Sequence, residues 1–93
     1  MTHETFDGWS LYQFGARLRQ MSGAVASYRR ILFGDERPAK ILVRPGGTFD
    51  LLLAEPPADE HSAPTWGEPR IFHNLAAAIT AGDAASIAGW EGA

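Results

Sequence analysis

Apolar residues recur at alternating spacings of three and four in the first part of the chain. They are Leu11, Phe14, Leu18, Met21, Val25, Tyr28 and Leu32. A spacing that averages roughly 3.5 residues lines one side of a helix, so the pattern predicts an amphipathic helix over residues 10–33. Ser10 followed by Gln13 matches an N-terminal capping box, and Gly34 fits a left-handed C-cap. Such a stripe must be covered, either by the rest of the domain or by a second chain.

A different period follows this segment. Two runs with alternating apolar side chains flank Pro45-Gly46-Gly47, which predicts a β-hairpin over residues 39–54 with a short turn. One face of the hairpin is expected to cover the helical stripe. Its apolar side chains are Ile41, Val43, Phe49, Leu51 and Leu53.

The last part of the chain predicts a loop and two short elements. Residues 55–69 hold four prolines and no apolar period, which is typical of a loop. Residues 70–72 suit a short third strand. Asn74 fits the N-cap of a short C-terminal helix that Gly82 would end, and Asp83 could cap one more turn over residues 84–88, all within the segment 70–90.

These elements predict a single α+β domain spanning residues 1–93. Its expected architecture is a long N-terminal amphipathic helix packed on a small antiparallel sheet, with a short C-terminal helix. Residues 1–9 form an N-terminal arm in this scheme. The helical stripe is expected to serve first as core and second as an interface, because the hairpin supplies apolar side chains to cover much of it.

Small residues beside the stripe predict where a second copy of the chain could approach. In a helix over residues 10–33, Gly15, Ser22 and Ala26 would lie together on one flank. We therefore expect this flank to be the contact of a homodimer.

Charge is distributed unevenly along the chain. The 93 residues have a net charge of −3. Residues 17–44 hold seven of the eight basic residues and two acidic ones, and residues 45–93 hold one basic and seven acidic residues. The two blocks either attract each other within one fold or leave an acidic face for a basic partner.

The sequence favours a chain without catalytic or cofactor chemistry. It has no cysteine, which excludes disulfides and thiol catalysis. His3, His61 and His73 lack metal-ligand spacing, and Arg44-Pro45-Gly46-Gly47-Thr48 is a hairpin turn without the features of a phosphate loop. We expect no enzyme activity, no cofactor and no metal. No apolar run is long enough for a membrane span, and the N-terminal residues do not resemble a signal peptide, so a cytoplasmic protein is expected.

The acidic segment around Trp66 is the predicted recognition site. It comprises Glu55, Asp59, Glu60, Trp66 and Glu68. Prolines stiffen such a segment and reduce the entropy lost on binding, and tryptophan is frequent at interface centres. The alternative is a solvated connector in which Trp66 fills a gap in the core.

Three functions remain open from the sequence. The first is a small non-enzymatic module that binds another protein and occludes or adapts its surface, such as a phage or plasmid accessory protein that inhibits host defence (anti-CRISPR-like). The second is a DNA-binding transcriptional or plasmid-maintenance regulator that uses the arginine-rich block 17–44; net negative charge makes nucleic acid a weaker expectation. The third is a small enzyme subunit.

Overall fold

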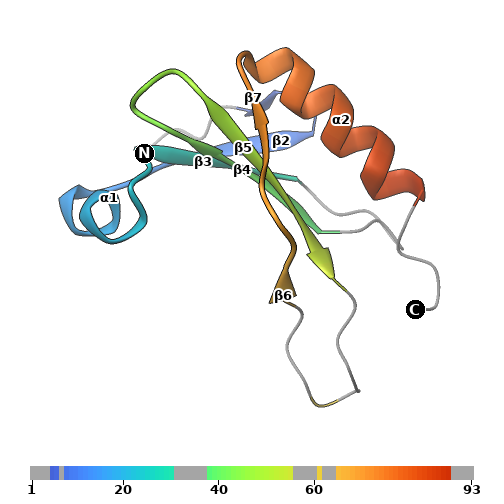
Figure 1. Ribbon diagram of the computed structural model, residues 1–93, viewed down its shortest axis with the longest axis horizontal. Coiled ribbons are helices and arrows are strands. Elements are labelled where there is room, and N and C mark those ends of the chain that lie inside the picture. The colour runs from blue at the N-terminus through green and yellow to red at the C-terminus, as the bar shows by residue number, and fades with distance from the viewer. Residues whose placement is uncertain (1–4, 7, 31–37, 56–60, 62–64, 89–93) are drawn as a thin grey trace.

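The computed structural model describes residues 5–6, 8–30, 38–55, 61 and 65–88. Within these residues seven strands form one antiparallel sheet, and two helices accompany it (Figure 1). The elements are β1 Thr5–Phe6, β2 Trp9–Gln13, α1 Ala16–Ser22, β3 Ala26–Arg30, β4 Ala39–Val43, β5 Phe49–Glu55, β6 Thr65–Trp66, β7 Arg70–Phe72 and α2 Leu75–Ala88.

From β1 to β6 the sheet is a meander in which each strand pairs with the next along the chain. The order is β1-β2-β3-β4-β5-β6, and β7 also pairs with β5. β6 and β7 lie along the same edge of β5, at Ala54–Glu55 and at Phe49–Leu51 respectively. Pro69 lies between them and has no N–H to donate, which accounts for the interruption of this edge.

One face of the sheet, the covered face, packs against α2 (Figure 1). Residues paired directly across antiparallel strands share a face, so the pairs Leu11–Tyr28, Tyr28–Ile41 and Ile41–Leu51 place one apolar set together. The buried core comprises Trp9, Ala39, Ile41, Leu51, Ala78 and Ile79. Helix burial on this face therefore supplies the hydrophobic stabilisation of the domain.

Contacts at Trp9 fix how α2 lies on the sheet. The Trp9 Nε1–H donates to Asp83 Oδ1 at 3.0 Å, and Arg30 forms an ion pair with the same carboxylate. A Cβ on Gly82 would lie 2.8 Å from the Trp9 ring, closer than normal packing allows. Gly82 is thus the point at which α2 approaches the indole.

The predicted C-terminal helix starts at the expected residue but does not end at Gly82. Asn74 Oδ1 accepts a hydrogen bond from the Ala77 N–H at 2.7 Å, as an N-cap does. The helix then continues to Ala88. The expectation that Gly82 ends it is wrong, because this glycine serves the close approach to Trp9 and not a left-handed cap.

The predicted fold class is wrong in its main element, since no long N-terminal helix exists. Residues 10–33 were expected to be one helix, yet their described part, 10–30, forms most of β2, the short helix α1 and β3. The domain is mainly an antiparallel sheet with two short helices, and α2 covers the hairpin in place of the predicted N-terminal helix.

Two glycines explain the break in the predicted helix. Gly15 is the N-cap of α1, and Gly23 is its C-cap with a φ of 71°, a left-handed conformation that favours glycine. The chain therefore folds back on itself, and Leu11 pairs with Tyr28 across β2 and β3. The middle members of the stripe, Leu18 and Met21, are 51% and 78% exposed. The stripe is therefore not a continuous core.

The predicted hairpin is present, with β4 and β5 joined by a turn and Ile41 opposite Leu51. Side chains that alternate with this set point to the other side of the sheet, which we call the open face because no described helix packs across it. The open face includes Tyr12, Ser27, Arg29, Lys40, Leu42, Asp50, Leu52 and Trp66. In the part of the chain that is described, neither helix has the length and apolar character needed to cross a bilayer.

Candidate functional site

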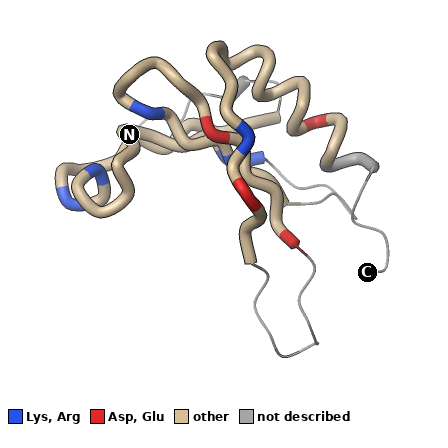
Figure 2. Tube along the Cα trace, viewed as in Figure 1, with Lys and Arg blue, Asp and Glu red and all other residues tan. Residues whose placement is uncertain are grey.

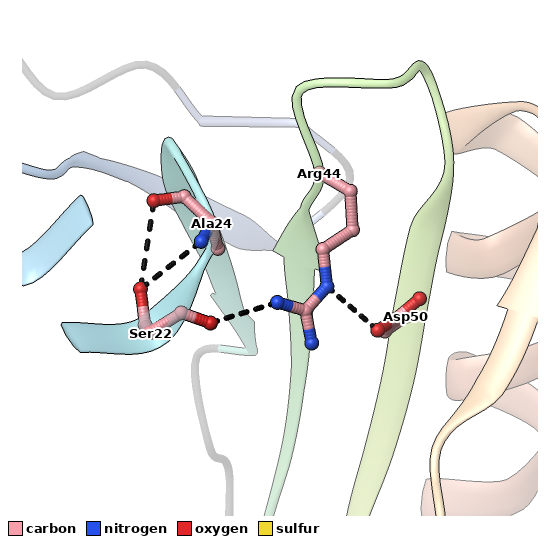
Figure 3. A network of polar contacts seen from close by, with 4 residues as sticks. All are labelled: Ser22, Ala24, Arg44 and Asp50. Atoms are coloured by element: carbon pink, nitrogen blue, oxygen red, sulfur yellow. Dashed lines mark hydrogen bonds and ion pairs between the residues drawn. The ribbon is translucent and has the colours of Figure 1, made fainter. Parts of the chain in front are cut away.

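Helix α1 is attached to the sheet by one arginine. Arg44 follows β4, and its Nε donates to Asp50 Oδ2 at 2.8 Å while its Nη1 donates to the Ser22 carbonyl at 2.8 Å (Figure 3). Asp50 is buried within β5. A single guanidinium therefore joins a buried carboxylate of the sheet to the last residue of α1, and charge-assisted hydrogen bonds of this kind are strong.

Local hydrogen bonds complete this end of α1. The Ser22 hydroxyl donates to the Leu18 carbonyl at 2.7 Å. It also accepts from the Ala24 N–H at 3.1 Å (Figure 3). The Gly23 N–H donates to the Arg19 carbonyl at 2.9 Å. These bonds satisfy backbone groups that a helix leaves free at its C-terminus. We call Ser22, Arg44 and Asp50 the α1 clamp.

The clamp holds a helix that contributes nothing to the core. No residue of α1 is buried. Leu18 and Met21 lie three residues apart, so they share one side of the helix, and both are exposed. Short helices are held in proteins mainly by packing of an apolar face, and α1 lacks that packing. The hydrogen bonds of the clamp therefore hold α1 in place of apolar packing, and α1 presents two apolar side chains to solvent.

A second group of side chains crosses the open face at the other end of β3. The Arg29 guanidinium carbon lies 5.3 Å from the Tyr12 ring centroid, and Lys40 Nζ lies 4.4 Å from the Trp66 ring centroid. Arg29 and Lys40 are directly opposite each other on β3 and β4. We call Tyr12, Arg29, Lys40 and Trp66 the cation–aromatic row, since the two cations lie between the two rings.

Burial lowers the pKa of the Lys40 ammonium below its ordinary value of 10.5, and the charge of Arg29 lowers it further. Within the described residues, neither Arg29 nor Lys40 forms an ion pair with a carboxylate. Like charges directly opposite on neighbouring strands are destabilising. The row therefore concentrates positive charge that the described acidic side chains do not neutralise.

The structure separates the predicted recognition residues around Trp66. Trp66 lies in β6 opposite Ala54 and is 42% exposed, so the alternative that it fills the core is wrong. Glu55 ends β5 and Glu68 follows β6, and both are exposed. Asp59 and Glu60 lie outside the described residues. The charged group over the Trp66 ring is the cation Lys40, not a carboxylate.

The predicted dimer flank does not exist as one helical surface. Gly15 precedes α1, Ser22 ends it, and Ala26 is buried at the start of β3. Their alignment required a continuous helix through all three residues. Gly15 and Ser22 instead mark the two ends of α1, and a role for them in dimer contact stays a prediction.

The basic block 17–44 is divided among several elements. Figure 2 shows basic residues on α1 and others on the sheet, without one continuous strip. Arg30 pairs with Asp83 on the covered face, Arg44 belongs to the clamp, and Arg29 lies on the open face. The sequence alone missed Tyr12, Arg29 and Lys40 as neighbours, because residues 12 and 29 were assigned to one helix. Alternation within residues 26–30 was the available signal.

No metal-binding cluster is present among the described residues: no three His, Asp or Glu side chains there are placed to hold an ion. His61 and His73 are both exposed. The chain matches no protein-family model, no curated protein and no solved structure. The α1 clamp and the cation–aromatic row are the features of the described structure that bear on function.

Proposed function

We propose that this chain is a non-enzymatic module that binds a partner protein through α1 and acts by occluding or adapting the partner's surface. The observation that carries this proposal is that α1 has no buried residue and is nevertheless fixed by the α1 clamp. Because α1 adds nothing to the core, the packing of the domain does not explain why this helix is held in one orientation.

The exposed surface of α1 suits a protein partner. Leu18 and Met21 offer adjacent apolar side chains, and methionine adapts readily to irregular binding surfaces. Arg17, next to Leu18, is also exposed and adds positive charge. A surface with an apolar groove and an acidic rim would complement these side chains, as helix-in-groove recognition requires.

A comparison of matched variants tests this proposal. We expect the double variant Leu18→Glu/Met21→Glu to fold as the wild type does, because substitutions at exposed positions change stability by about 0.5 kcal/mol or less. Gln20→Glu adds a carboxylate to an exposed position of the same helix and serves as the control. Each protein is immobilised, and the proteins that it captures from a cell lysate are identified by mass spectrometry.

The expected result is a protein that the wild type and Gln20→Glu retain and the double variant loses. Light scattering on the same three proteins shows whether that partner is a second copy of this chain. Capture that is the same for all three proteins, with unchanged oligomeric state, would show that α1 is not the binding element.

A further inference from the structure

A hollow opens beside the cation–aromatic row, where β3 ends and β4 begins. Its volume is about 360 Å³, and it is lined by Arg29, Arg30, Pro38, Ala39, Lys40 and Trp66. Sites for small molecules commonly have volumes of roughly 300–1,000 Å³. This hollow therefore has room for a compact ligand of about mononucleotide size.

The charge of the described lining residues favours an anion. Arg30 is neutralised by Asp83. Arg29 and Lys40 face each other across the strands without a carboxylate partner among the described residues. An anion between them would add two attractive contacts that offset the repulsion between the cations. The partial burial that lowers the pKa of Lys40 also reduces the solvent screening of such contacts.

The two rings hold the cations in place for this task. Tyr12 lies next to the Arg29 guanidinium and Trp66 lies next to the Lys40 ammonium, so both long side chains are oriented before a ligand arrives. Preorganisation lowers the entropy lost on binding. Trp66 also adds an apolar surface beside the charged groups for the uncharged part of a ligand.

We propose that this hollow binds a small phosphate ester, with the phosphate held between Arg29 and Lys40. A phosphate monoester carries a charge of about −1.5 to −2 near neutral pH, which matches two cations, whereas a carboxylate would leave one unmatched. The guanidinium can bind two phosphate oxygens at once, and the ammonium acts as a point charge on a third. This site is separate from α1 and does not depend on the function proposed for that helix.

Calorimetric titration of the whole chain with adenosine 5′-monophosphate (AMP) tests the proposal. AMP is expected to bind, and adenosine, which lacks the phosphate, to bind at least about tenfold more weakly. Arg29→Gln and Lys40→Gln should each weaken AMP binding by at least about tenfold, since each removes a charged hydrogen-bond donor. Thermal unfolding of each variant shows that the fold is retained.

Arg70→Gln is the matched control for these variants. Arg70 is an exposed arginine whose guanidinium lies 5.6 Å from the Phe72 ring centroid, and it is not part of the hollow. This variant should bind AMP as the wild type does. Equal binding of AMP and adenosine, wild-type AMP binding by both Arg29→Gln and Lys40→Gln, or no AMP binding at millimolar concentration would overturn the proposal.

A short oligothymidylate distinguishes the source of the phosphate. If the site binds one phosphate, the affinity of the oligonucleotide should exceed that of AMP by no more than the number of phosphates that can occupy the site. Much tighter binding with a steep dependence on salt concentration would indicate a nucleic-acid surface and would overturn the choice of a small ester.

Discussion

On the covered face of the sheet, α2 buries Ile41 and Leu51 and touches the Trp9 ring, whereas the open face carries charged groups held by two rings and by the Asp50 carboxylate. Apolar burial on the covered face is non-directional and scales with area, so it supplies stability. The hydrogen bonds of the α1 clamp and the contacts of the row depend on geometry, so they place particular side chains. The two proposed recognition sites thus use contacts other than the apolar burial that stabilises the domain.

The largest expected difference is in the free energy of unfolding when a leucine is replaced by alanine, either under α2 or in α1. Leu51→Ala should lower the free energy of unfolding by about 2–5 kcal/mol, because Leu51 is fully buried under α2 and its loss leaves a cavity. Leu18→Ala in α1 should change it by about 0.5 kcal/mol or less. Urea denaturation measures both, and equal effects would contradict the division between the faces.

Removal of the clamp arginine should have the next largest effect. Arg44→Met leaves the buried Asp50 carboxylate without its donor, so we expect a loss of about 1–3 kcal/mol. Hydrogen exchange by NMR should show that the amides of α1 exchange faster than in the wild type. The amides of α2 should lose protection only to the extent that the global free energy of unfolding is lower. Uniform loss of protection across both helices would mean that the clamp does not act on α1 in particular.

A smaller effect is expected where α2 meets Trp9. Gly82→Ala places a methyl group 2.8 Å from the indole, and the resulting overpacking should cost about 1–3 kcal/mol, partly offset by the better helix propensity of alanine. Gly46→Ala in the β4–β5 turn is the control, since a Cβ there meets nothing within 4 Å. Thermal unfolding should show a lower midpoint for Gly82→Ala alone.

The smallest predicted effect is a pH dependence on the open face. The pKa of Lys40 is lower in the folded protein than its ordinary value of 10.5, so the unfolded chain binds this proton more tightly. The unfavourable contribution of Lys40 is therefore fully present at neutral pH and decreases as the pH rises toward 10.5. The difference in unfolding free energy between wild type and Lys40→Gln should shift in favour of the wild type at alkaline pH; a constant difference would contradict this assignment.

Two local features, one turn and one cap, could be predicted from the sequence because they depend on neighbouring residues, whereas the caps assigned to Ser10 and Gly82 were wrong, since Ser10 lies in β2 and α2 continues past Gly82. Pro45-Gly46-Gly47 marked the hairpin, and Asn74 marked the start of α2. The long helix could not be excluded by period alone. Leu11 and Tyr28 fit a heptad spacing and also face each other across β2 and β3, since a chain that folds back symmetrically brings such positions together. Gly15 and Gly23 were the residues that distinguished the two structures.

The candidate sites were less accessible to sequence analysis, because both depend on pairing between distant segments. Lys40 and Arg29 become neighbours through the register of β3 and β4, and Trp66 joins them through β6. The sequence left open whether Trp66 fills the core; it is 42% exposed, and its charged neighbour is a cation and not a carboxylate. Arg44 and Asp50 lie six residues apart around a turn, and the pairing of β3 with the end of β4 brings Ser22 close to them.

The position of α2 in the chain has a consequence for synthesis. Every strand precedes α2, and sequential strands can pair soon after they are made because their contacts are local. Ile41 and Leu51 nevertheless stay uncovered until Ala78 and Ile79 have been added. A nascent chain therefore exposes an apolar sheet face for most of its elongation, and we expect a chain stopped before residue 75 to aggregate.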